Sequence, residues 1–118
     1  MKKFKVYLTN SFLKDLSRVF EFIKISSPQN AKMVVDNIKK SIMTLANTPE
    51  AHPKAYEAAS FENLNLRQLI CKNHRIIYLI KRQNVYVLSL LNCKQELISR
   101  DKLEQILSLR VKNIFDEI

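Results

Sequence analysis

Two arginines stand inside strand-like segments of the stretch NLRQLICKNHRIIYLI, which spans residues 65–80. Arg67 and Arg75 each carry a planar guanidinium, which can bind a carboxylate or a phosphate through two parallel hydrogen bonds. The surrounding stretch from Asn63 to Gln95 contains no Asp or Glu. We therefore expect a basic surface that binds an anion or an anionic target. Its candidate residues are Arg67, Lys72, Lys81, Arg82 and Lys94.

Arg75 and Tyr78 are expected to serve the fold instead. Arg75 directly precedes Ile76-Ile77-Tyr78 in an apolar segment, and a charge in such a place needs a partner of opposite sign. A carboxylate on a helix, such as Asp15 or Glu21, is the predicted partner. Tyr78 is expected to be a half-buried strand aromatic whose hydroxyl reaches a partner group.

The sequence contains few residues that could bind a metal ion or a nucleotide cofactor. The chain has two cysteines, two histidines and no glycine. The absence of glycine excludes glycine-rich phosphate loops and dinucleotide fingerprints, and the cysteines and histidines lack the spacing of a metal site. We predict no cofactor and no metal, with Cys71 and Cys93 as small buried residues and His74 exposed at a turn. Positive φ angles are expected at Asn73 and Asn84.

The charge and the length of the chain restrict the class of protein further. A formal net charge of +9 favours an acidic partner, such as nucleic acid, an anionic surface or an acidic protein. A chain of 118 residues with 47% hydrophobic content predicts one domain over 1–118 with a substantial core. No apolar run approaches the roughly 20 residues of a membrane helix, and no signal-peptide core follows the first lysines. We expect a cytoplasmic protein without membrane contact.

The periodicity of apolar residues predicts the elements that position these side chains. Residues 3–9 alternate as a strand does, and two amphipathic helices follow, the second beginning at Ser27-Pro28. A loop is expected over 48–63. Three strands joined by short turns are then predicted at 64–71, 74–81 and 85–92. With a last helix at 99–115, the fold class is α+β, in which an N-terminal strand and a helical hairpin pack with a twisted antiparallel sheet of about four strands.

This order of elements resembles the RelE/ParE superfamily of toxins from type II toxin–antitoxin systems, which includes plasmid-stabilisation proteins. The likeness covers residues 3–95, and four stretches carry it: VYLTNSFLKDLSRVFEFI, SPQNAKMVVDNIKKSIMTLANTP, NLRQLICKNHRIIYLI and VYVLSLLNCKQ. The resemblance implies a toxin that a cognate antitoxin holds inactive, in an oligomer of the two. Antitoxins of this superfamily wrap the toxin with a helix and an extended segment and often carry acidic residues, which agrees with the basic charge.

Two activities occur in this superfamily, and a shared fold does not separate them. RelE-like members cut mRNA at the ribosome, and the resemblance puts Arg67 and Lys94 at cationic positions of such a nuclease. The histidine position of the superfamily is Asn92 here, and no Tyr or His follows Tyr86. Because an amide does not transfer a proton near neutral pH, we expect ParE-like binding of an essential target such as DNA gyrase. Ribosome-dependent mRNA cleavage is the alternative, and the catalytic residues stay unassigned.

Two further alternatives stay open at this point. The net charge alone would also suit a non-toxic, basic nucleic-acid-binding domain with salt-dependent affinity. The C-terminal extension at 99–115 either closes an exposed face of the sheet or presents an apolar surface to the target or to a second copy.

Overall fold

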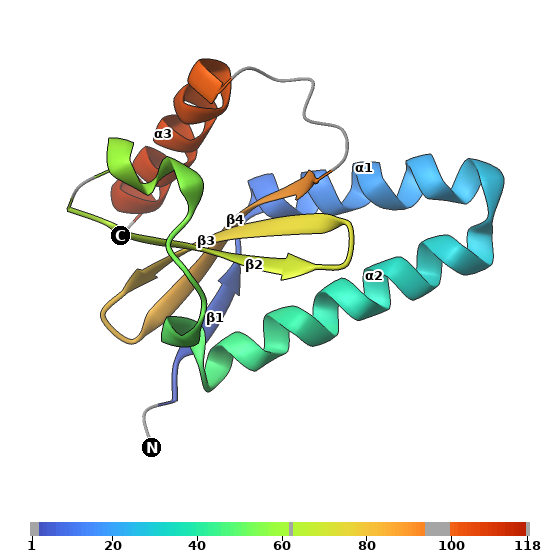
Figure 1. Ribbon diagram of the computed structural model, residues 1–118, viewed down its shortest axis with the longest axis horizontal. Helices are drawn as coiled ribbons and strands as arrows, with labels where there is room; N and C mark the ends of the chain where they lie inside the picture. The colour runs from blue at the N-terminus through green and yellow to red at the C-terminus, as the bar shows by residue number, and fades with distance from the viewer. Residues whose placement is uncertain (1–2, 62, 94–99, 118) are drawn as a thin grey trace.

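The computed structural model describes residues 3–61, 63–93 and 100–117. A four-stranded sheet lies between two helical layers, with a hairpin of α1 and α2 against one face and α3 on the other (Figure 1). The helices are α1 (Asn10–Ser26), α2 (Pro28–Met43) and α3 (Arg100–Glu117). The strands are β1 (Lys5–Leu8), β2 (Asn65–Cys71), β3 (His74–Lys81) and β4 (Asn84–Asn92). The predicted α+β class and order of elements are confirmed.

The sheet has the strand order β1-β4-β3-β2. Antiparallel hairpins join β2 to β3 and β3 to β4, as the short turns predicted. β1 pairs with β4 in the parallel direction, from Lys5 beside Asn84 to Leu8 beside Val87, so the sheet is mixed where we expected antiparallel pairing throughout. Turn lengths define the direction of consecutive strands, but they carry no information about β1, whose partner is far away in the sequence.

One serine joins the two helices of the hairpin. The backbone N–H of Ser27 donates to the carbonyl of Ile23 at 2.9 Å and ends α1. Its side-chain oxygen accepts from the N–H of Asn30 at 3.2 Å and caps α2, whose first residue is Pro28. Thr9 caps α1 in the same way, accepting from the N–H of Phe12 at 3.2 Å. The start of α2 at Ser27-Pro28 is therefore as predicted.

Each face of the sheet has its own hydrophobic core, because successive side chains of a strand point to opposite faces. On β3, Ile76 and Tyr78 face the hairpin, whereas Ile77 and Leu79 face α3. The hairpin contributes Phe12, Leu16, Ile38 and Ile42 to the first core. The second core receives Leu107, Val111 and Ile114 from α3. Burial on both sides explains why β3 is apolar almost throughout.

The connections differ from the expectation in two ways. The segment expected as a loop over 48–63 contains two short 3₁₀ helices, η2 (Pro49–Ala51) and η3 (Tyr56–Ser60), and a third, η1 (Thr44–Ala46), ends α2. Positive φ angles occur at Lys72 (54°) and Arg82 (58°), not at Asn73 and Asn84. Cys71 pairs with His74 and Lys81 with Asn84, so each turn has two residues. It is the first of the two that adopts the left-handed region.

Two observations on the described residues bear on metals and membranes. Within them, no group of three or more His, Cys, Asp or Glu side chains could hold a metal ion. None of the helices described is both long enough and apolar enough to cross a membrane. The cysteines are less buried than predicted, since Cys71 is only partly covered and Cys93, just past the end of β4, is exposed.

Candidate functional site

Arg67 lies on β2 and faces the side of the sheet that carries the hairpin. Its guanidinium bonds to the protein itself. Nε donates to Oδ1 of Asn65 at 2.9 Å, and Nη1 donates to the backbone carbonyls of Glu50 at 3.2 Å and His52 at 2.6 Å. The side chain thus holds the η2 segment against the sheet.

Tyr78 and His52 complete the surroundings of Arg67. Tyr78 pairs with Arg67 across the two strands, and its hydroxyl donates to the carbonyl of Pro49 at 2.6 Å. Tyr78 is fully buried, more than predicted, but its structural use of the hydroxyl agrees with the prediction. Burial raises the pKa of Tyr78, opposed by the charge of Arg67. Burial and, after it, the same charge lower the pKa of His52, whose ring lies edge-on to Tyr78.

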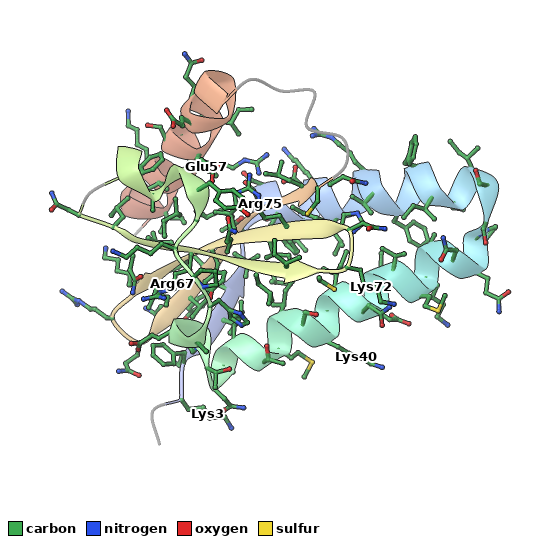
Figure 2. The ribbon with its side chains drawn as sticks, in the orientation of Figure 1. Lys3, Lys40, Glu57, Arg67, Lys72 and Arg75 are labelled. Atoms are coloured by element: carbon green, nitrogen blue, oxygen red, sulfur yellow. The ribbon has the colours of Figure 1, made fainter. Side chains whose placement is uncertain are left out.

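Arg75 points to the opposite face of the sheet and serves the fold, as predicted, but with a different partner. Its Nη1 and Nη2 donate to the two carboxylate oxygens of Glu57 at 2.8 and 3.0 Å, and Nη1 also donates to Oε1 of Gln68 at 3.2 Å. The guanidinium lies 5.1 Å from the ring centre of Tyr56. Neither Asp15 nor Glu21 is this partner. Figure 2 shows Arg75 beside Glu57, which η3 carries over the sheet.

The predicted basic residues do not form one cluster. Lys72 lies in the β2–β3 turn, whereas Lys81 and Arg82 lie at the β3–β4 turn, at the other end of the sheet. Figure 2 shows Lys72 and Arg67 well apart. Antiparallel hairpins place consecutive turns at opposite ends of a sheet, so an acid-free stretch of sequence need not be a patch in space. Lys94 lies outside the described residues. The anion-binding roles assigned to these residues stay predictions.

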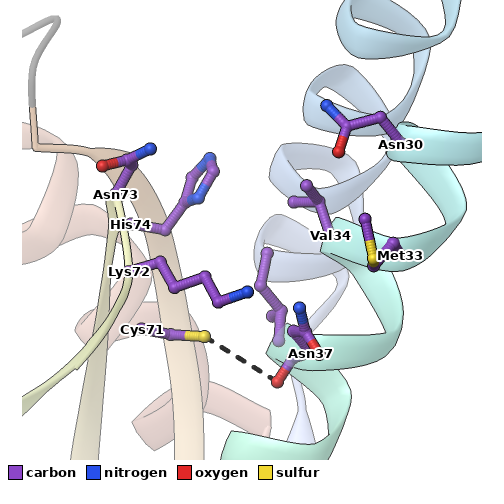
Figure 3. Close-up of a pocket in the computed structure, with 9 residues that line it drawn as sticks. Asn30, Met33, Val34, Asn37, Cys71, Lys72, Asn73 and His74 are labelled. Atoms are coloured by element: carbon purple, nitrogen blue, oxygen red, sulfur yellow. Dashed lines mark hydrogen bonds between the residues drawn. The ribbon is translucent and has the colours of Figure 1, made fainter. Parts of the chain in front are cut away.

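The hairpin extends past the end of the sheet (Figure 1), and pockets lie there between its two helices and the β2–β3 turn. Two adjoining pockets, with volumes of about 200 and 340 Å³, share four residues and form what we call the hairpin groove. The shared residues are Asn30, Val34, Asn73 and His74. Figure 3 shows Lys72 reaching from the β2–β3 turn towards α2, and the thiol of Cys71 bonded to the carbonyl of Asn37.

The hairpin groove combines apolar, amide and cationic side chains. Phe22 and Met33 are 67% and 55% exposed at its edge. Arg18 lines it from α1 with a side chain 77% exposed. None of the described residues that line the two pockets is an acid. Exposed apolar side chains beside cations, in a groove whose described lining holds no acid, are typical of a surface that binds an acidic protein segment.

His74 lies inside the hairpin groove and is 7% exposed, so the prediction of an exposed turn histidine is wrong. It is the first residue of β3 and faces α2, which covers it. Burial lowers the pKa of His74. Near pH 7 the imidazole is therefore neutral. The positive charge of the groove comes from Lys72 and from Arg18, whose Nη1 also lies 3.7 Å from Oδ1 of Asp15.

The helix residues of the hairpin groove were not predicted from the sequence. The predicted basic residues lie in or beside the strands, whereas the apolar contacts of the groove come from α1 and α2. The available signal was the group of exposed large apolar residues on the two helices, of which Phe22 and Met33 line the groove. Their exposure has no explanation in the core.

Comparison with known proteins found one matching family model and solved structures of similar fold. The family model described as ParE toxin of type II toxin-antitoxin system, parDE, matches residues 6–97. A solved structure described as a chromosomal ParDE TA system from P. aeruginosa has a TM-score of 0.65 and 14% identity, over 78% of this chain and 98% of that chain. At this identity the likeness concerns the fold. No curated protein matches.

Proposed function

Because the chain belongs to the ParE toxin family of type II toxin–antitoxin systems, we propose that it arrests growth in the cytoplasm by binding an essential target such as DNA gyrase. A cognate antitoxin neutralises it within a toxin–antitoxin oligomer. In this proposal residues 1–118 act as one toxin domain that has a C-terminal helical extension.

Action by binding is supported above all by the state of Arg67. A nuclease needs this guanidinium open to a phosphate, where it would stabilise the charge that develops as the bond breaks. Here three hydrogen bonds direct it to Asn65 and to the η2 backbone. An arginine that holds a loop in place supports a surface of fixed shape better than it supports catalysis.

The hairpin groove is the proposed site of the antitoxin. An acidic, amphipathic segment would set apolar side chains against Phe22, Met33 and Val34, and its carboxylates against Lys72 and Arg18. The groove already exists in the free chain, so its partner binds without a large change of the toxin backbone. Charge complementarity of this kind raises the rate of association and discriminates against basic competitors.

Ribosome-dependent mRNA cleavage is the second candidate, and the contact between Arg67 and His52 favours it. His52 has a lowered pKa and is therefore a neutral imidazole at pH 7, a state that can accept a proton. In this alternative Arg67 contacts the phosphate and His52 supplies the general base that the C-terminal stretch lacks. Lys94 would provide the second cation.

Induced expression with two readouts separates these candidates. The ParE-like function predicts that purified protein inhibits DNA gyrase in a supercoiling assay, while transcripts stay intact after induction. Intact gyrase activity with rapid mRNA cleavage would instead establish the nuclease, and cleavage should then be lost in His52→Gln. Binding to arbitrary DNA and RNA with a steep salt dependence, and without growth arrest, would support the basic nucleic-acid-binding domain.

A further inference from the structure

α3 lies outside the part of the chain that the family model matches. The family match ends at residue 97, and the matched P. aeruginosa chain is 98% covered by 78% of this one. α3 begins at Arg100 and packs on the sheet face opposite the hairpin. Leu107, Val111 and Ile114 are at most 5% exposed there, against Leu66, Ile77, Leu79 and Leu88. This helix therefore covers one whole face of the sheet from outside the range that the family model matches.

α3 also supplies a hydrogen-bond donor to the edge of β4. β1 pairs with β4 only as far as Val87, so none of the described strands lies beside the backbone groups that follow on that side. The carbonyl of Leu88 instead accepts from Nη1 of Arg110 at 3.0 Å, and the N–H of Leu90 donates to Oδ2 of Asp15 at 3.1 Å. Two side chains from distant helices thus continue the hydrogen bonding where β1 stops.

Arg110 and Asp15 also bond to each other. Nη1 and Nη2 of Arg110 donate to the two carboxylate oxygens of Asp15 at 2.7 and 3.2 Å, and Nη1 also donates to Oγ of Ser89 at 2.6 Å. Asp15 and Ser89 are buried, 9% and 1% exposed. A guanidinium provides this set of donors in one plane, whereas the ammonium of lysine is a single point with a different geometry.

We propose that the sheet face beneath α3 is a helix-binding site that selects arginine, with α3 as the ligand that occupies it. The ligand pattern is Leu107, Arg110, Val111 and Ile114, which lie on one side of a helix. Asp15, Ser89 and the β4 edge recognise the arginine, and the second core recognises the three aliphatic side chains. While α3 is bound, this face is closed to any other helix. The site is separate from the hairpin groove and does not depend on its proposed role.

A labelled peptide of residues 100–117 tests the site in trans. Full-length Arg110→Ala, whose own α3 is weakened, should bind this peptide at least about tenfold more tightly than the wild-type chain, where α3 competes. A peptide with Arg110→Lys should bind at least about tenfold more weakly than the native peptide. A peptide with Leu109→Ala is the matched control and should bind as the native peptide does, because Leu109 is 61% exposed. Equal affinity for the arginine and lysine peptides would overturn the proposal, as would equal binding to both chains.

Hydrogen exchange gives a second test that remains useful if Arg110→Ala folds poorly. The milder Arg110→Lys chain should exchange the amides of α3 at least about tenfold faster than the wild type, with α2 unchanged. Arg18→Ala is the control, since Arg18 also lies near Asp15, at 3.7 Å, but its side chain is 77% exposed. It should leave α3 protected. Unchanged exchange of α3 in Arg110→Lys, or equal acceleration by Arg18→Ala, would contradict the proposed site.

Discussion

The two sides of the sheet use positive charge in opposite ways. On the α3 side, Arg75 and Arg110 each hold a carboxylate of the same chain through two hydrogen bonds, to Glu57 and to Asp15. On the hairpin side, Lys72 lies at a groove whose described lining includes no acid. A cation with its own carboxylate stabilises the fold, whereas a cation at an acid-free groove is left to meet the charge of a partner. The comparison makes predictions that can be ordered by size.

The largest effect on stability is expected on the α3 side of the sheet, at Glu57. Glu57→Ala should lower the free energy of unfolding by about 3 kcal/mol, because the buried guanidinium of Arg75 would lose a carboxylate that it holds through two hydrogen bonds. Both residues are 3% exposed. Urea denaturation measures the change. The double variant Glu57→Leu with Arg75→Met should recover much of the loss, since it removes both charges. A loss below 1 kcal/mol in the single variant would break the distinction between the two sides.

On the hairpin side of the sheet, a substitution at the groove is expected to change the binding of a partner and not the stability of the fold. Lys72→Glu should weaken binding of the cognate antitoxin by about tenfold or more, because a like charge replaces the complementary one. Arg82→Glu is a matched control, since Arg82 is also exposed and also takes the positive-φ position of a two-residue turn. Titration calorimetry of both variants measures the difference. Equal weakening by the two variants would mean that net charge, and not the hairpin groove, determines affinity.

The buried histidine of the hairpin groove should make the stability of the fold depend on pH. Burial lowers the pKa of His74 in the folded chain, so the unfolded chain takes up the proton first as the pH falls. The free energy of unfolding should therefore decrease below about pH 6.5 and be fully present above it. His74→Gln should flatten this decrease between about pH 7.5 and 5, leaving the part due to His52. An unchanged slope in the variant would show that His74 gains its proton equally in both states.

The smallest effect concerns the turns. Lys72→Gly and Arg82→Gly should each change the free energy of unfolding by less than about 1 kcal/mol and in the stabilising direction, because glycine adopts positive φ without a steric cost. Thermal unfolding measures both. Only Lys72→Gly should also weaken antitoxin binding. Loss of stability in both variants would indicate that the long side chains make contacts that outweigh the strain.

Much of the fold could be predicted because local patterns encode it. Ser27-Pro28 contains the whole signal for the start of α2, and β3 was predicted at its observed bounds of 74–81. The partner of Arg75 could not be predicted, since Glu57 lies in a segment without periodicity. The parallel pairing of β1 depends on contacts between the two ends of the chain.

The candidate site was less predictable than the fold for a related reason. A run of residues without acids predicted a patch, but two-residue turns send Lys72 and Arg82 to opposite ends of the sheet. The hairpin groove depends on how far α1 and α2 extend beyond the strands. That relation involves the lengths of four elements and their packing, and no single stretch of sequence contains it.

The single residue between α1 and α2 has a consequence for the speed of recognition. Ser27 ends one helix and caps the next, so the two helices are fixed at their shared end and have no linker through which to spread apart. A partner that docks between this hairpin and the sheet therefore meets a preformed surface. Its association rate should be governed by diffusion and charge, so that it falls with added salt, with no slow opening step before the encounter.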